Sequence, residues 1–168
     1  IDIDKYRDRF VFVDTKTVFE NDIQVFPCQS NLYPPPKANM TLFKDAGNGL
    51  VADDFNHELI VSFGTDTLLV YSGCAHKGVL NILNSVKSNI GKPVTRRRGG
   101  FHLLDSNEWQ KCETDKEIVE IGENLRVNYP QTVFITGHCT GEHVYNQLKS
   151  KLQDKLIHFY TGYSISIN

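Results

Sequence analysis

The stretch Tyr71–Leu83, YSGCAHKGVLNIL, joins the end of an expected strand to the start of an expected helix. The residues that lead into it, TLLVY, are mostly apolar and indicate a strand, which Ser72 and Gly73 end. After the corner, apolar residues recur at helical spacing, at positions Val79, Leu83, Val86 and Ile90. The corner itself carries a thiol, Cys74, and an imidazole, His76. We therefore expect two potential metal ligands at the end of a strand.

The same alternation of strand and helix continues along the chain and predicts an α/β layered fold. Expected strands cover residues 9–14, 21–27, 58–63, 67–73, 131–137 and 156–167. The third and fourth of these, joined by the turn GTD, form an expected hairpin. Expected helices cover 77–91, the segment around Ile118, Ile121 and Leu125, and 142–155. Three consecutive prolines, Pro34–Pro36, predict a loop.

Length and composition limit the class of protein. The chain has 168 residues, which predicts one domain over residues 1–168. Its net charge of −2 provides no attraction to nucleic acid or to a membrane surface, and no apolar run approaches the ~20 residues of a membrane span. The four cysteines lack the spacing of a disulfide framework, so we expect reduced thiols and a cytoplasmic location.

Four of the six histidines lie at the end or edge of an expected strand: His57, His76, His102 and His138. Strand ends at one sheet edge are where open α/β sheets bind ligands. Imidazole, thiolate and carboxylate are the usual ligands of zinc, with Mn²⁺ and Fe as alternatives. The nearby acids, Asp53, Asp54 and Glu58, either bind the metal directly or orient the imidazoles.

Other polar residues have a simpler interpretation. His143, on an expected helix, and His158, in the closing strand, are expected to be structural. The run Thr95–Arg98 contains Arg97 and Arg98, which either bind an anionic substrate group or form a solvated edge. Cys74 and Cys139 flank candidate ligands, whereas Cys28 and Cys112 have no such neighbour.

Three segments together resemble the second half of metallo-β-lactamase superfamily proteins: SGCAHKGVLNIL, GGFHLL and TGHCTG. The similarity is to the branch with dihydropterin-phosphate-synthase-like metallohydrolases, and it covers residues 50–168 better than the first fifty. The resemblance implies an αββα sandwich with metals at one edge. It implies that His138 is a metal ligand, that Cys74 or His76 points at the metal, and that His57 falls near a third ligand position. His102 matches a residue near the site, with a catalytic, substrate-contacting or ligand role.

One departure from the superfamily is large. The superfamily signature His-x-His-x-Asp-His occurs nowhere in this sequence. In the superfamily it lies in the first half of the fold, and the chain also begins without methionine. We therefore expect only the C-terminal half of the sandwich in this chain, with the remaining ligands on another segment, another chain or a second copy. The alternative is that the protein has lost the motif and the activity with it.

Three functions are consistent with these observations. The first is a hydrolase in which a zinc-activated water attacks an ester or phosphoester of a small anionic substrate. The second is a non-catalytic half-domain that needs a partner chain to complete the metal site, which predicts an exposed apolar sheet face. The third is redox or metal sensing through Cys74 and Cys139.

Overall fold

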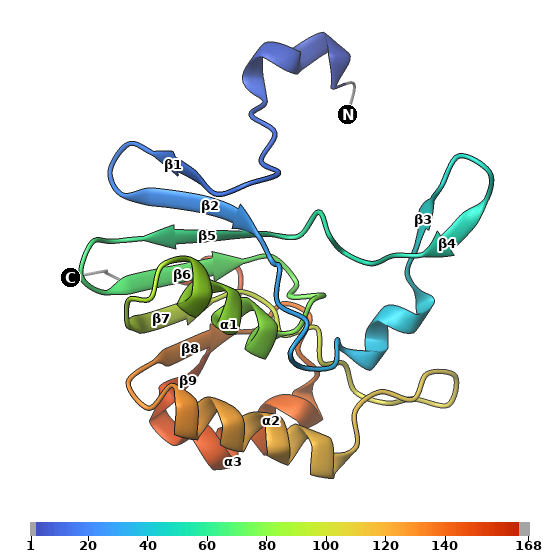
Figure 1. Cartoon of the computed structure of the whole chain (residues 1–168). Helices are drawn as coiled ribbons and strands as arrows, with labels where there is room; N and C mark the ends of the chain where they lie inside the picture. Colours follow the sequence, from blue (N-terminus) through green and yellow to red (C-terminus); the bar gives the residue numbers. More distant parts are fainter. Residues whose placement is uncertain (1–2, 165–168) are drawn as a thin grey trace.

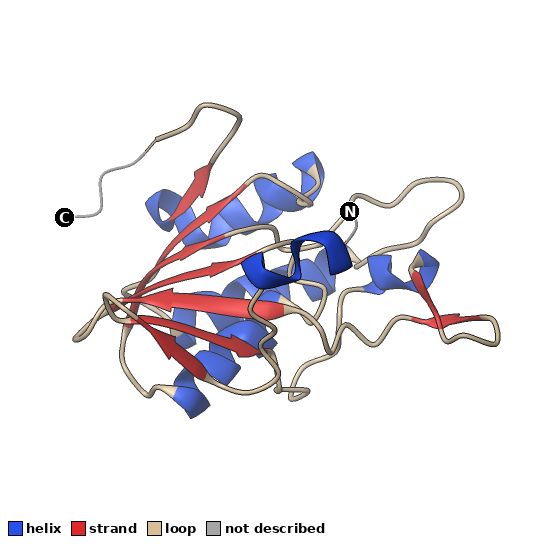
Figure 2. Ribbon diagram, turned by 90° about the horizontal axis from the view of Figure 1, so that it is seen from above, coloured by secondary structure: helices blue, strands red, loops and turns tan. Residues whose placement is uncertain are grey.

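One twisted sheet of seven strands organises the chain in the computed structural model, which describes residues 3–164. The strands lie in the order β1-β2-β5-β6-β7-β8-β9, as Figure 1 shows, and they fan out when viewed from above in Figure 2. Their bounds are Thr17–Phe19, Ile23–Pro27, Leu59–Phe63, Leu68–Ser72, Val94–Arg98, Val133–Thr136 and Leu156–His158. The first four pair antiparallel and the last four pair parallel, with β6 shared between the two sets.

Helices connect the parallel strands and cover one face of the sheet. They are α1 (Val79–Asn89), α2 (Asp115–Asn128) and α3 (Glu142–Leu152). Their apolar faces form one core with inward side chains of the sheet, including Phe26, Ile60, Val70 and Phe134. The α/β class expected from the sequence is therefore confirmed.

The opposite face of the sheet carries apolar side chains that α1, α2 and α3 do not cover. Cross-strand pairing places Val25 beside Val61, and Val61 beside Tyr71. A second row joins Phe63 to Leu69. All but one of these side chains are half-buried, and Tyr71 is exposed. Residues 3–164 thus form one large sheet with helices on one side, which corresponds to half of a sandwich.

Most of the expected elements are confirmed, with some corrections. The prediction of a strand at residues 9–14 is wrong. The first of these residues ends the short 3-10 helix η1 (Asp4–Arg9), and the rest of the segment is irregular. Phe10, Val11 and Phe12 are all exposed, so this segment has aromatic and β-branched residues but no neighbouring strand. The closing strand is also shorter than expected, since β9 ends at His158, and residues 165–168 lie outside the described part.

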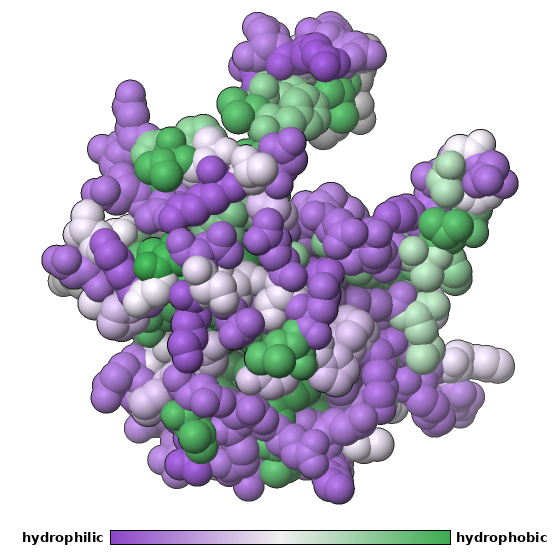
Figure 3. All heavy atoms as spheres, viewed as in Figure 1, coloured by the Kyte–Doolittle hydropathy of each residue, from purple (hydrophilic) through white to green (hydrophobic). Residues whose placement is uncertain are grey.

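A small hairpin at residues 43–52 and the N-terminal segment project from the body (Figure 3). The hairpin of β3 (Phe43–Asp45) and β4 (Leu50–Ala52) follows the 3-10 helix η2 (Lys37–Thr41), and a third 3-10 helix, η3 (Gln153–Lys155), precedes β9. Figure 3 shows the hairpin and the N-terminal segment standing away from the body, each with apolar side chains on its surface. Within residues 3–164, none of the helices has the length and apolar character needed to cross a bilayer.

Candidate metal centre

Three loops meet at one edge of the sheet, where β6, β7 and β8 end. Because these strands are parallel neighbours, their carboxyl ends lie side by side. The loop after β6 carries Cys74 and His76, the loop after β7 carries His102, and the loop after β8 carries His138 and Cys139. Residues from three separate sequence motifs therefore come together in space.

Two thiols and an imidazole form the tightest group at this edge. The Nε2 atom of His138 lies 3.1 Å from the Sγ atom of Cys74 and 3.2 Å from that of Cys139. The two sulfurs are 3.6 Å apart. These three residues could hold a metal ion, and His138 is exposed while the cysteines are half-buried.

The spacing of these atoms fits a tetrahedral zinc ion. Bonds of about 2.3 Å to sulfur and 2.0–2.1 Å to nitrogen imply ligand–ligand separations of about 3.8 Å for two sulfurs and about 3.6 Å for sulfur and nitrogen. The observed separations are shorter by at most about half an ångström. Three protein ligands on a partly exposed site leave one position open, as in catalytic rather than structural zinc sites.

A second group, His76 and His102, lies against the first. Their ring centroids are 4.0 Å apart, and His76 also stacks on Phe55 at 4.2 Å. His102 is 6% exposed, and both of its ring nitrogens are buried without a hydrogen-bond partner among residues 3–164. An orphaned buried imidazole is unusual, because buried polar groups are normally paired. The unpaired His102 ring is the strongest indication that a metal ion or another ligand binds at this edge.

Burial keeps these imidazoles neutral. Burial, together with smaller contributions from the nearby His76 and His138, lowers the pKa of His102 to about 4. Burial also lowers the pKa of His76, against the opposing effect of Glu58. Since only neutral imidazole binds metal, both side chains are available as nitrogen ligands at neutral pH. Burial, with a contribution from Cys74, raises the pKa of Cys139 to about 11, so without metal this thiol keeps its proton.

Glu58 fixes the loop that carries Cys74 and His76. Its two carboxylate oxygens accept hydrogen bonds from the backbone N–H groups of His76 and Lys77, each at 2.8 Å. The side chain is buried, and the Asn39 side chain holds the His76 ring from the other side through a 3.1 Å contact to Nδ1. Glu58 therefore orients the loop rather than binding metal through its own oxygens.

Gly100 allows the loops to approach each other across the end of β7. A Cβ atom at this position would lie 2.5 Å from the carbonyl oxygen of His138 and 2.9 Å from that of Cys74. Each loop also contains one residue with positive φ that is not glycine: Ala75, His102 and Cys139. Backbone strain of this kind is typical of functional sites, and here it occurs in all three loops.

The other predicted site residues lie elsewhere or have structural contacts. His57 is exposed, and its Nδ1 atom lies 3.8 Å from a carboxylate oxygen of Asp53, so the structure does not bring it into the cluster of Cys74, His138 and Cys139. Asp54 pairs with Lys44, and this ion pair lowers its pKa. Cys139 was expected to flank a candidate ligand and to take part in metal sensing, but it was not included in the expected ligand set, although its position next to His138 was the signal for it.

The two arginines differ in their surroundings. Arg97 is completely buried, and its guanidinium donates hydrogen bonds to the carbonyl oxygens of Gly99 and Gly100 and to the Ser72 hydroxyl. This placement favours a structural role over the substrate contact expected from the sequence, because the group faces the protein interior. Arg98 is half-buried, with its guanidinium 5.0 Å from the centre of the Phe159 ring, and remains a candidate for anion binding.

Replacing Arg97 with alanine is expected to lower the free energy of unfolding by about 3 kcal/mol or more, since it leaves buried oxygens unpaired at the ends of β6 and β7. Urea denaturation would measure the change. Arg126→Ala is the matched control, because Arg126 forms an exposed pair with Glu123, and its loss should change stability by less than about 0.5 kcal/mol. Equal effects of the two substitutions would contradict a structural role for Arg97.

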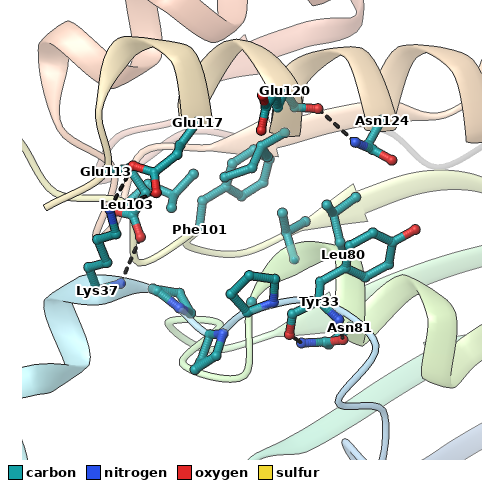
Figure 4. Close-up of a pocket in the computed structure, with 16 residues that line it drawn as sticks. Tyr33, Lys37, Leu80, Asn81, Phe101, Leu103, Glu113, Glu117, Glu120 and Asn124 are labelled. Atoms are coloured by element: carbon teal, nitrogen blue, oxygen red, sulfur yellow. Dashed lines mark hydrogen bonds and ion pairs between the residues drawn. The ribbon is translucent and has the colours of Figure 1, made fainter.

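A separate pocket of about 180 Å³ lies on the helical side of the sheet (Figure 4). Phe101 and Leu103, which flank His102, form one wall, and the Pro34–Pro36 segment forms another. At one end Lys37 pairs with Glu117 at 2.6 Å. None of the candidate metal residues lines this pocket. The ion pair of Lys37 and Glu117 anchors the end of the proline segment to α2.

The comparisons with known proteins agree with this architecture. No family model matches the chain. One solved structure with a similar fold is that of Tm1679, a metal-dependent hydrolase of the β-lactamase superfamily. The similar region covers 94% of this chain and 58% of that chain, with a TM-score of 0.68 and 21% sequence identity. The chain has a metallo-β-lactamase fold. The large sheet has helices on one face, and the chain covers only part of the neighbour. Both findings agree with the expected half of the sandwich.

A curated relative points to the same branch that the sequence motifs resemble. It is the 7,8-dihydropterin-6-methyl-4-(beta-D-ribofuranosyl)-aminobenzene-5'-phosphate synthase of Methanocaldococcus jannaschii, 26% identical over 128 residues. The match covers 75% of this chain and 41% of the relative. The chain therefore spans less than half the length of the curated relative that it matches.

Proposed function

We propose that this chain carries part of the active site of a metal-dependent hydrolase. The observation that carries the proposal is the convergence of Cys74, His138 and Cys139, with the unpartnered His102 beside them. The donor set of two thiolates and neutral imidazoles favours zinc, with iron as the alternative, over the oxygen-preferring Mn²⁺. When bound, such a metal supplies a water activated for attack at neutral pH.

The residues of the chain would have distinct roles. His138, Cys74 and Cys139 would hold the metal, with His76 and His102 as neutral imidazoles near these ligands. Glu58 and Arg97 would keep the loops in position through the hydrogen bonds described above. His102 would also limit water access beneath the site, because its ring fills the space against His76.

The substrate class we propose is an ester or phosphoester with an anionic group. Arg98 is the side chain of this chain best placed to bind that group, because it lies at the end of β7 and its guanidinium is half-buried. The name of the curated relative, a phosphate synthase, supports a phosphate-bearing compound. A planar guanidinium suits phosphate because it can donate two hydrogen bonds at once.

Cobalt substitution tests the metal site independently of substrate. Titration of the metal-free protein with Co²⁺ is expected to produce a thiolate-to-cobalt charge-transfer band and the intense visible bands of tetrahedral cobalt. Cys74→Ser and Cys139→Ser should each weaken the charge-transfer band by about half, because each removes one of two thiolate ligands. Cys112→Ser is the control, since Cys112 is buried elsewhere and should leave the spectrum unchanged. An octahedral spectrum without charge transfer would reject the proposed ligand set.

A second candidate function is a half-domain that needs a partner to complete the metal site. The uncovered apolar face of β2, β5 and β6 favours it, because such a face is normally covered in a sandwich. The missing half of the fold, or a second copy of the chain, would supply the cover. The two candidates are compatible if the partner brings the remaining ligands.

Sedimentation measurements would test whether this face mediates association. Val61→Lys places a charge at the centre of the face and should abolish self-association or binding of the partner. Val127→Lys is the control, because Val127 lies exposed on α2 and its replacement should have no effect. If the unmodified chain, Val61→Lys and Val127→Lys all sedimented as the same stable monomer, this second function would be excluded.

A further inference from the structure

The two cysteines of the candidate metal centre are positioned to react with each other as well as with a metal. Cys74 and Cys139 are separated by 65 residues in the sequence, yet their sulfurs are 3.6 Å apart. Each follows a different strand of the parallel part of the sheet, so tertiary structure alone creates the pair. The other two cysteines lie apart from this pair and are buried. Cys28 contacts the Ser85 hydroxyl, and Cys112 lies just before the start of α2.

We propose that Cys74 and Cys139 form a reversible disulfide when the site holds no metal, and that this oxidation blocks metal binding. The inference rests on the proposed metal site, because it concerns the same two thiols. Its chemistry is nevertheless separate, since the disulfide can form whether or not the protein is a hydrolase. The site would then exist in a dithiol form that binds metal and an oxidised form that cannot.

The geometry supports formation of the bond within one chain. A disulfide bond is about 2.05 Å long, so the two sulfurs must approach by about 1.5 Å from their present separation. Both thiols are half-buried, so they stay accessible to a small oxidant and to a small thiol reductant. Gly100 keeps the two loops close together, because its missing side chain leaves room for the backbones of Cys74 and His138.

The reaction balances with a peroxide as oxidant. One thiolate attacks an oxygen of hydrogen peroxide, the O–O bond breaks, and the sulfur becomes a sulfenic acid while hydroxide takes a proton to form water. The sulfur of the second cysteine then attacks the sulfenic sulfur. The S–S bond forms, the S–O bond breaks, and the second thiol proton leaves with the hydroxide as water. Two thiols are oxidised by two electrons, and one peroxide is reduced to two waters.

Metal and disulfide exclude each other because both use the same sulfur electrons. A bound zinc ion needs two thiolates, whereas a disulfide has none. Bound metal should therefore protect the pair from peroxide, and oxidation should prevent metal from binding. A thiol reductant should restore the dithiol and the metal site together.

The test is peroxide treatment of the purified chain with and without zinc. In the metal-free protein, we expect loss of two hydrogens in the intact mass and a peptide pair linked through Cys74 and Cys139. Prior loading with Zn²⁺ should slow this reaction at least tenfold. The oxidised protein should bind Zn²⁺ at least 100-fold more weakly, as measured by competition with a chromophoric chelator, and dithiothreitol should restore binding.

Single substitutions make the test specific. In Cys74→Ser or Cys139→Ser, the remaining thiol should stop at a sulfenic acid that dimedone traps, whereas Cys112→Ser should still form the disulfide. Links through Cys28 or Cys112, or sulfinic acids in place of a disulfide, would overturn the inference. Zinc binding without disulfide formation would also overturn it but leave the proposed function standing. Disulfide formation in a protein that binds no Zn²⁺ even when reduced would overturn the second half of the inference, the block of metal binding, and would also reject the proposed function.

Discussion

Replacing His138 with alanine is expected to weaken Zn²⁺ binding at least about 100-fold and to abolish the proposed hydrolase activity. His138 is the residue that joins the cluster, since its Nε2 atom contacts both sulfurs. Loss of a residue that only orients a ligand already costs about 10–100-fold in metal affinity, so loss of a ligand should cost at least as much. Metal content after dialysis and chelator competition would measure the change.

The control for this substitution is His143→Gln. His143 lies at the start of α3, is exposed, and pairs with Asp115 at 2.7 Å away from the cluster. Its replacement should leave both the metal content and the thiolate-to-cobalt band unchanged. If the His138→Ala protein retained metal and full turnover, the assignment of the metal centre would be wrong.

Replacing Gly100 with alanine is expected to lower the free energy of unfolding by about 3 kcal/mol, because the new Cβ atom meets backbone atoms that cannot move aside separately. The nearest of these are the carbonyl oxygens of His138 and Cys74, which belong to the two loops that hold the thiols. For a chain of this size, the loss corresponds to a melting temperature about 6–12 °C lower. Metal affinity should fall as well, since the loops must separate.

Gly73 provides a matched control for this prediction. It lies in the same loop as Cys74, and a Cβ atom at Gly73 would meet nothing within 4 Å. Gly73→Ala should therefore change the melting temperature by no more than about 2 °C and leave zinc binding intact. Thermal unfolding followed by circular dichroism would compare the three proteins. Similar losses in both variants would show that close approach at Gly100 is not what holds the loops together.

Local sequence patterns predicted most of the α/β part of the chain, although the central strand β7 was not among the expected strands. Runs of apolar residues separated by a turn predicted β5 and β6. Apolar residues repeated at helical spacing predicted α1, α2 and α3, because this period places them on the side that faces the core. The same reasoning failed at residues 9–14, where a strand-like composition has no neighbouring strand to pair with. Composition records the preference of a segment, whereas a strand also requires hydrogen-bond partners.

The sequence also predicted which corners hold potential ligands, but it could not show which of them converge. His57 and His138 both sit near strand ends in the sequence, yet only His138 lies with Cys74 and Cys139. The order of strands decides this, since β6, β7 and β8 are neighbours with parallel ends. That order depends on contacts between distant segments, which no local pattern contains.

What the sequence determined by itself was therefore most of the strands and helices, without β7, and the presence of thiols and imidazoles at the corners between them. The tertiary structure alone decided that Arg97 is buried, that His57 is exposed and that Cys139 joins Cys74. The physical reason is that local preferences act over a few residues, whereas burial and ligand geometry depend on which strands become neighbours.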